Sequence, residues 1–173
     1  LSLGGSLILK LLEKHSSLID RVIVDGASPQ PIKGYRKIIA IVYLMSFLKN
    51  TKFVANLLTK MMKEDGAPVQ DVQHFVADFQ RASRGSFRRA MSRANLLRLD
   101  LQFDNPAFFV SGGKEAETIH DWHRRLAHKN ARSEWAYYPD KGHAWLFSDV
   151  DTHIQLLRYF FQDVAFPEKL KRF

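Results

Sequence analysis

The chain has 173 residues, of which 46% are hydrophobic and 25% charged, a composition that argues against wholesale disorder and allows a sizeable core. Lys and Arg (26) outnumber Asp and Glu (18), so the formal net charge is +8. The lack of cysteine excludes disulfides, cysteine-ligated metals and cysteine nucleophiles. No apolar run reaches the roughly 18 residues of a membrane span. We expect a cytoplasmic protein without a metal or other cofactor.

The first segment, residues 1–33, contains one predicted helix and one predicted strand. Residues 4–14 are rich in Leu and Ile and indicate a largely buried helix. Residues 21–24 form a short β-branched run that stops at Asp25-Gly26. This pattern predicts a buried strand with a loop at its carboxyl end.

The second segment, residues 34–98, shifts to helix-forming residues, with breaks at 65–68 and 83–86. Apolar residues recur at helical spacing in each piece, and no strand pattern intervenes. We therefore expect three to four helices that form a distinct insert. The Met and Phe residues of 38–62 are most simply interpreted as its core.

The third segment, residues 99–173, returns to alternating strands and helices. Strands are predicted at 107–110 and 134–138, and helices at 115–129 and 151–164. In the last helix we expect four side chains to face inward: Ile154, Leu157, Phe160 and Phe161. The whole order, with near-continuous apolar strands, is typical of an α/β protein with a parallel sheet covered on both faces.

Three loops at the carboxyl ends of strands carry candidate reactive groups, because such loops meet at one edge of a parallel sheet. They hold Ser2, Glu115 and His143. Ser2-Leu3-Gly4-Gly5 matches the second half of a nucleophile elbow, in which a serine occupies a strained turn between strand and helix. Gly4 is the small residue that allows the turn to close.

These motifs resemble the α/β-hydrolase superfamily over essentially the whole chain. Phe109-Val110-Ser111-Gly112-Gly113-Lys114-Glu115 is similar to the family's strand followed by Gly-x-x-acid, and Lys141-Gly142-His143 is similar to its Gly-His. Glu115 departs from the Asp of most members. The resemblance implies an α/β-hydrolase fold with residues 34–98 as a helical lid. Because the family has about five further strands, we expect the chain to be a C-terminal portion that is inactive alone.

The resemblance also implies the roles of the site residues. Ser2 would be the nucleophile, His143 its general base and Glu115 the acid that orients the imidazole. The backbone N–H of Leu3 would donate to the oxyanion. The expected reaction is cleavage of a small-molecule carboxylic ester, with a small or apolar acyl group, through an acyl-enzyme. The same triad also serves amides, thioesters and carbon–carbon bonds.

Each site residue also has a structural alternative. Ser2 could be an ordinary helix N-cap, and Glu115 a carboxylate placed in the first helical turn by the helix dipole. His143 could be a capping or surface loop histidine. Asp25, after the preceding strand, is the alternative acid. His120, His123 and His128 could be read as metal ligands, but a solvated helix face explains them better.

The strongest charge cluster consists of arginines at positions 81, 84, 88, 89, 93 and 98. Such a cluster could bind nucleic acid or an anionic membrane. We favour the polar face of a lid helix and expect no nucleic-acid partner. The alternative function is a non-catalytic binding protein that uses this arginine-rich helix for an anionic partner.

Overall fold

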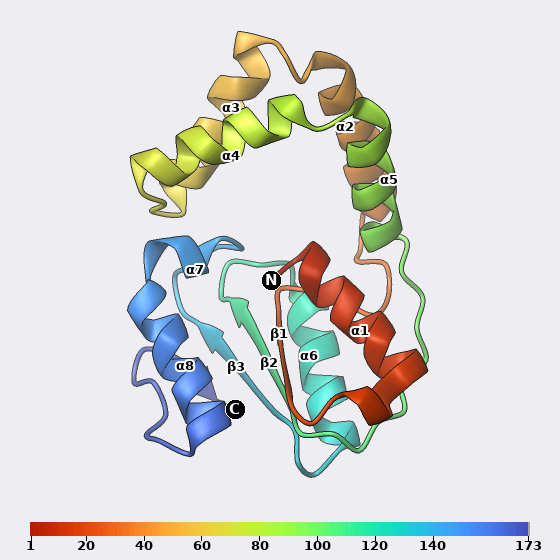
Figure 1. The fold of residues 1–173 in the computed structure, drawn as a ribbon, viewed down its shortest axis with the longest axis vertical. Helices are drawn as coiled ribbons and strands as arrows, with labels where there is room; N and C mark the ends of the chain where they lie inside the picture. The colour runs from red at the N-terminus through yellow and green to blue at the C-terminus, as the bar shows by residue number, and fades with distance from the viewer. Residues whose placement is uncertain (173) are drawn as a thin grey trace.

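A computed structural model describes residues 1–172 (Figure 1). In chain order, the elements are α1 (Leu3–His15), a short 3-10 helix (Ser16–Leu18), β1 (Val22–Asp25), α2 (Tyr35–Leu48), α3 (Lys52–Glu64), α4 (Val69–Arg81), α5 (Arg84–Asn95), β2 (Ala107–Gly112), α6 (Glu117–Lys129), β3 (Glu134–Tyr138), α7 (Trp145–Ser148), α8 (Val150–Gln162) and β4 (Lys171–Arg172). The predicted helices and strands are therefore present, with the predicted bounds shifted by at most two residues.

The strands of the described chain form one sheet in the order β1-β2-β3-β4. β1, β2 and β3 are parallel, with Val22 opposite Ala107 and Phe109 opposite Trp135. The predicted α/β class with a parallel sheet is confirmed. Because the three strands run in one direction, the loops that follow them meet at one edge of the sheet, which we call the carboxyl edge.

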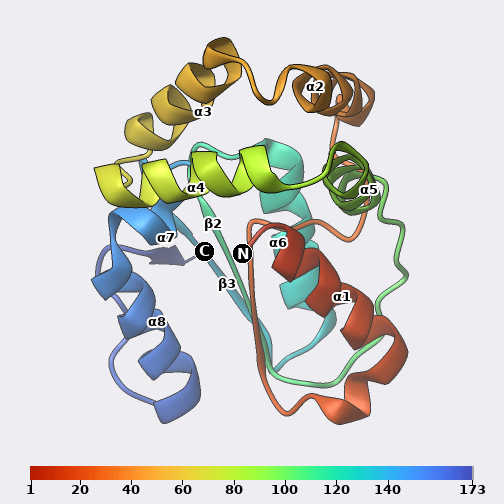
Figure 2. The ribbon, with the colours of Figure 1, turned by 45° about the horizontal axis from the view of Figure 1, so that its top comes forward.

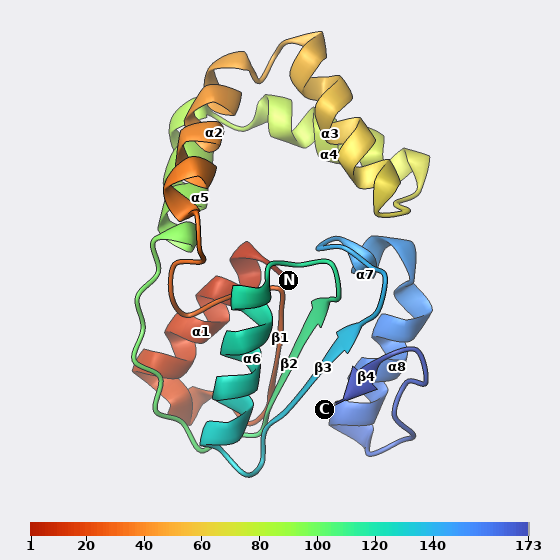
Figure 3. The same cartoon turned by 180° about the vertical axis from the view of Figure 1, so that it is seen from behind.

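Helices cover both faces of this sheet (Figure 3). One face packs under α1 and α6 through a core that includes Leu9, Leu12, Val24, Phe109 and Leu126. The other face packs under α7 and α8 through Phe108, Val110, Trp145, Leu156 and Phe160. Successive residues of β2 point to opposite faces, and both faces are buried. This double burial explains why the strand is apolar at nearly every position.

The helical insert, residues 34–98, forms an arch over the carboxyl edge (Figures 1 and 2). Within it α5 lies beside α2, and α4 lies beside α3. The chain enters and leaves the arch by adjacent segments: Leu99 N donates to Pro29 O at 3.0 Å, and Gln30 Nε2 donates to Leu99 O at 2.9 Å. These bonds hold the two ends of the insert together beside the sheet.

The side chains of the insert are more exposed than the sequence indicates. Met62 is buried, but Phe47, Phe53 and Met61 are 58%, 69% and 54% exposed. The expectation that the Met and Phe residues of 38–62 form mainly core is therefore wrong. The reason is that the helices of the insert lie in pairs, so α2 and α3 each bury only a narrow stripe and their other apolar faces stay uncovered.

The inward face of the last helix also differs from the expectation. α8 buries Thr152, Leu156 and Phe160, whereas Ile154, Leu157 and Phe161 are 39%, 36% and 48% exposed. The buried stripe includes a polar residue, Thr152, whose hydroxyl donates to Asp149 Oδ2 at 2.9 Å. The prediction is therefore confirmed for Phe160 and wrong for Ile154, Leu157 and Phe161, because apolar residues alone define a different stripe.

Three further features were not predicted. A break between α2 and α3 is stabilised by Thr51, whose side chain accepts from Val54 N. The short helix α7 follows the third loop of the carboxyl edge, and the two residues of β4 pair antiparallel with Ala136 and Tyr137. In the described part of the chain, every helix is too short or too polar to cross a membrane.

The first turn of α1 packs against the end of β1, and this contact makes a testable prediction about stability. A Cβ on Gly5 would lie 2.7 Å from Ala27 Cβ, whereas a Cβ on Gly4 would meet nothing within 4 Å. We expect Gly5→Ala to lower the free energy of unfolding by about 1–3 kcal/mol through overpacking. Gly4→Ala should raise it by up to about 1 kcal/mol through helix propensity. Urea unfolding of both variants measures the difference, and equal midpoints would contradict this packing.

Candidate active site

The carboxyl edge brings Glu115 and His143 into direct contact. Glu115 follows β2 and His143 follows β3, and Glu115 Oε2 lies 2.7 Å from His143 Nδ1. The other carboxylate oxygen, Oε1, accepts from Gly112 N at 3.0 Å. The Glu115 side chain is 3% exposed, and that of His143 is 45% exposed. The pair therefore presents a buried, fixed carboxylate and an imidazole with one accessible side.

Backbone bonds between the two loops fix this pair. Gly113 N donates to Tyr138 O at 2.7 Å, and Lys114 N donates to Lys141 O at 2.9 Å. A side chain on Gly112 would overlap the carbonyl of Gly142. Glycine at position 112 is therefore required for the close approach of the loops that carry Glu115 and His143.

The surroundings of His143 shift its titration. Burial alone lowers the pKa of His143, but the hydrogen bond and the charge of Glu115 outweigh burial, and the charges of Asp25 and Asp65 act in the same direction. The net result is a pKa above the ordinary value of a histidine, about 6.5. The carboxylates thus stabilise the imidazolium form of His143.

Gly26 lies against both members of the Glu115–His143 pair. It has a φ of 57°, and a Cβ there would lie 2.8 Å from His143 Nδ1 and 3.1 Å from Glu115 Oε1. Its N–H donates to Val110 O at 2.9 Å, which continues the ladder between β1 and β2. Glycine is favoured at position 26 both by backbone conformation and by lack of space.

Ser2 lies in a strained turn directly before α1. Its φ and ψ are 54° and −119°, a region that a residue other than glycine rarely adopts. Its side chain makes no capping hydrogen bond, so the alternative of an ordinary N-cap serine does not describe it. Its N–H donates to Asp25 O at 2.9 Å, which ties the turn to the end of β1. Leu3 is the first residue of α1, where N–H groups have no intrahelical acceptor.

Asp25 is the last residue of β1 and is 2% exposed. Its Oδ1 accepts from the indole N–H of Trp145 at 3.2 Å, while Oδ2 has no hydrogen-bond partner. Burial raises the pKa of Asp25 well above the ordinary value of a carboxyl, and the charge of Glu115 raises it further. The protonated form of Asp25 therefore persists to a much higher pH than that of an exposed Asp. The residue contacts Trp145, whereas Glu115 contacts the histidine.

The structure thus brings together two of the three residues expected to form a triad and places the third on the adjacent loop. The described residues contain no hydrogen bond between the Ser2 hydroxyl and His143. The link between them runs through the backbone, from Ser2 N to Asp25 O and from Gly26 to the His143 ring. Glu115 lies before α6, which begins at Glu117, so it is not a first-turn carboxylate.

The expectation for the histidines of α6 is wrong for two of the three. His120 and His123 are buried, at 8% and 0% exposure, on the face that packs against β2. Nδ1 of His120 lies 3.2 Å from Ser111 Oγ, and Nε2 of His123 donates to Ala27 O at 2.9 Å. Burial lowers the pKa of His123 to about 4, so its ring is neutral. Residues 1–172 contain no cluster of three or more side chains suited to hold a metal.

Two of the clustered arginines, Arg84 and Arg88, contact aromatic rings of α2. The guanidinium of Arg88 lies 5.3 Å from the ring centre of Tyr43, and that of Arg84 lies 5.9 Å from the ring centre of Phe47. Arg84 also donates to Phe47 O at 3.3 Å. These contacts hold α5 on α2. Packing within the insert therefore accounts for part of the arginine cluster.

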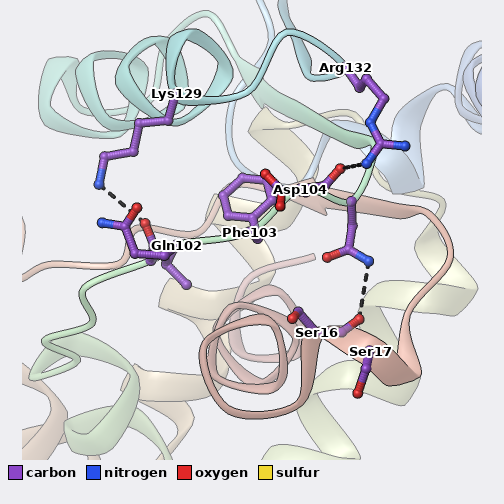
Figure 4. Close-up of a pocket in the computed structure, with 9 residues that line it drawn as sticks. Ser16, Ser17, Gln102, Phe103, Asp104, Lys129 and Arg132 are labelled. Carbon is purple, nitrogen blue, oxygen red and sulfur yellow. Dashed lines mark hydrogen bonds between the residues drawn. The ribbon is translucent and has the colours of Figure 1, made fainter.

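A cavity of about 510 Å³ lies at the opposite edge of the sheet, lined by Ser16, Ser17, Leu101, Gln102, Phe103, Asp104, Asn105, Lys129 and Arg132 (Figure 4). Three of its polar side chains, those of Asn105, Lys129 and Arg132, are paired within the protein. Asn105 Nδ2 donates to Ser16 O at 3.1 Å, and Lys129 Nζ donates to Leu101 O at 3.2 Å. These bonds stabilise loops between elements. The candidate site therefore lies at the carboxyl edge.

Sequence reasoning missed three residues at the carboxyl edge: Gly26, Trp145 and Asp65. The signal for Gly26 was its place directly after a strand. No pattern singled out Trp145, whose role follows from its burial and its bond to Asp25. Asp65 was visible only as part of a helix break, although its Oδ2 accepts from Ala144 N at 3.3 Å, next to His143.

Comparison with known proteins supports the fold alone. No protein-family model matches the chain, and no match was found among curated proteins. Solved structures do match. An enol-lactonase from Burkholderia xenovorans LB400 has a TM-score of 0.73 at 16% identity, covering 94% of this chain and 64% of that one. A hydrolase from Pseudomonas aeruginosa PA01 has a TM-score of 0.71 at 19% identity, covering 92% and 62%.

A third match is an α/β-hydrolase enzyme from a Medee basin deep-sea metagenome library. It has a TM-score of 0.69 at 16% identity and covers 94% of this chain and 63% of that one. The chain thus spans less than two thirds of the length of these structures. Over the part that it spans, the chain has the α/β-hydrolase fold.

Proposed function

We propose that the protein is a serine hydrolase that cleaves a carboxylic ester through an acyl-enzyme. The observation that carries this proposal is the Glu115–His143 hydrogen bond at the carboxyl edge, beside the strained Ser2 turn. A buried carboxylate on Nδ1 leaves Nε2 of the imidazole to accept a proton. A serine on a strained turn exposes its hydroxyl to such a base.

The proposed reaction has two steps. In acylation, Ser2 Oγ attacks the ester carbonyl carbon while His143 Nε2 takes the hydroxyl proton; the ester C–O bond then breaks, and the alcohol leaves with that proton. In deacylation, His143 takes a proton from water, which attacks the acyl-serine, and Ser2 regains its proton as the acid leaves. The N–H of Leu3, the first residue of α1, would donate to the oxyanion. No cofactor is required.

Apolar side chains of the insert favour an apolar acyl group. Residues exposed on α2 and α3 include Leu44 at 59%, Phe53 at 69% and Met61 at 54%. A lid with such a surface would contribute apolar area to substrate binding, worth roughly 25 cal/mol per Å² buried. We therefore propose residues 34–98 as the lid of this hydrolase.

The first prediction concerns the nucleophile. A fluorophosphonate reacts with a serine whose hydroxyl is activated by a neighbouring base, so it should label the complete protein at Ser2, as located by peptide mass spectrometry. Ser2→Ala should abolish labelling. Ser6→Ala, one turn further along α1, is the matched control and should label like the unsubstituted protein. Labelling that survives Ser2→Ala would exclude Ser2 as the nucleophile.

The second prediction separates the two candidate acids. Glu115→Gln removes the carboxylate that holds His143 and should slow labelling by about 10³–10⁴-fold, as expected for loss of a triad acid. Asp25→Asn keeps an oxygen that can accept from Trp145 and should slow labelling by less than about tenfold. The labelling rate of each variant at one pH measures the contrast. The reverse order would assign the acid to Asp25.

The third prediction is the pH dependence of labelling. Because only neutral His143 can accept the proton of Ser2, the rate should rise with pH and level off above the pKa of His143. That pKa is raised by Glu115, so the midpoint should lie above the ordinary histidine value of about 6.5. Labelling rates measured from pH 5 to 9 test this. A rate that falls as the pH rises through this range would contradict a histidine base.

A further inference from the structure

One carboxylate of the helical insert touches the loop that carries His143. Asp65 follows the last residue of α3, and its Oδ2 accepts from Ala144 N at 3.3 Å. Its Oδ1 lies against Gly142, where an added Cβ would overlap the carboxylate. Asp65 therefore contacts both residues that flank His143. The neighbouring Gly66 reaches the same region, since a Cβ there would lie 3.0 Å from Ser148 Cβ.

The position of Asp65 is unfavourable for its own helix. The C-terminal end of a helix carries a partial negative charge, so a carboxylate there is repelled. The helix end does not need this carboxylate, because Gly66, with a φ of 82°, provides the left-handed residue that terminates it. The bonds of that cap are main-chain only: Gly66 N donates to Lys63 O at 2.9 Å and Ala67 N to Met62 O at 2.9 Å.

Asp65 is electrostatically unfavourable at its own helix end and is not needed for the cap of that helix. This combination indicates that the residue has a role in another contact. The other groups near Asp65 line a cavity of about 100 Å³: Glu64, Gly66, Lys114, Asp140, Lys141 and Gly142. Glu64 pairs with Lys60 at 3.7 Å, and Lys141 Nζ donates to Ser148 Oγ at 3.3 Å. The Asp65 carboxylate differs from them in accepting from the backbone directly after His143.

We propose that Asp65 is a positioning residue for His143, through which the helical insert fixes the histidine loop and adds negative charge beside the imidazole. The inference rests on the proposed function, since it assigns His143 as the base. The carboxyl groups that raise the pKa of His143 come from three parts of the chain. Glu115 follows β2, Asp25 ends β1, and Asp65 belongs to the insert. The first two lie at or just after the ends of sheet strands, so Asp65 is the member of this set through which the placement of the insert affects the base.

Two substitutions separate the charge of Asp65 from its hydrogen bond. Asp65→Asn removes the charge but keeps an oxygen that can accept from Ala144 N. Asp65→Ala removes both. We expect each to lower the pKa of His143 by about 0.3–1 unit, measured by NMR titration of its ring protons, because a nearby opposite charge is lost. Only Asp65→Ala should speed amide hydrogen exchange at Ala144, by about threefold or more.

The matched control is Glu64→Gln, which removes the same charge one residue earlier, from a carboxylate that faces Lys60. It should move the titration of His143 by less than about 0.2 unit, because solvent and salt screen an exposed charge. A purely structural role for Asp65 would alter stability and exchange but leave the pKa of His143 in Asp65→Asn unchanged. If Asp65→Asn titrates like Glu64→Gln, the proposal is overturned.

Neither the NMR titration of His143 nor the hydrogen exchange at Ala144 requires the protein to turn over a substrate. If the fluorophosphonate fails to label Ser2 while Asp65→Asn still lowers the pKa of His143, the hydrolase proposal fails and the coupling between the insert and the histidine loop stands. If labelling is normal and the pKa does not move, the positioning role fails and the hydrolase proposal stands. In the first case the coupling would act on a histidine with some other role.

Discussion

The hydrogen bond between Glu115 and His143 is the interaction on which the arrangement of the carboxyl edge depends. A bond of 2.7 Å requires the loops after β2 and β3 to lie so close that their backbones are in contact. Glycine makes this approach possible at two points. Gly112 leaves room for the carbonyl of Gly142, and Gly26 leaves room for the imidazole and the carboxylate together. A side chain at either glycine would separate the acid from the base.

The same bond determines the electrostatics of the site. Asp25 and Glu115 both lie in buried positions near His143, and two adjacent carboxylates cannot both carry charge without a high cost. The two carboxyl groups lie in different environments and have different hydrogen-bond partners. Glu115 receives the N–H of Gly112 and the histidine, while Asp25 receives one indole N–H and leaves Oδ2 unpartnered. Burial, together with the charge of Glu115, therefore raises the pKa of Asp25 to about 7, whereas Glu115 is the carboxyl group that contacts the imidazole.

Much of the fold was predictable because it follows from short-range patterns. The run around Phe108 and Phe109 is apolar because both faces of β2 are buried, and such a run indicates a parallel strand without any tertiary information. The positions of Glu115 and His143 followed from the same rule, since groups after parallel strands share an edge. The Ser2 motif predicted a strained turn, which its φ of 54° shows.

Other features depended on contacts between distant segments, which no local pattern encodes. His123 is polar but buried, because its N–H meets the carbonyl of Ala27, which follows β1 in the chain. The expectation that Gly4 is the small residue of the turn misplaced the tight contact by one residue. The structure places that contact at Gly5, whose surroundings are supplied by Ala27 and the Asp25 carbonyl. The exposure of Phe53 likewise depends on which helices lie beside α3.

Asp65 is a residue that local patterns mark as unfavourable but that makes a favourable contact with a distant segment. As a helix-end residue it is locally unfavourable, and the pattern Asp-Gly reads simply as a break. Its contact with Ala144 joins segments that lie 79 residues apart in the chain. The strands alone can align Glu115 with His143, but they cannot relate that pair to the position of the insert. Asp65 belongs to the insert and accepts a hydrogen bond from the residue directly after His143. This hydrogen bond connects the arch to the loop that carries the proposed base.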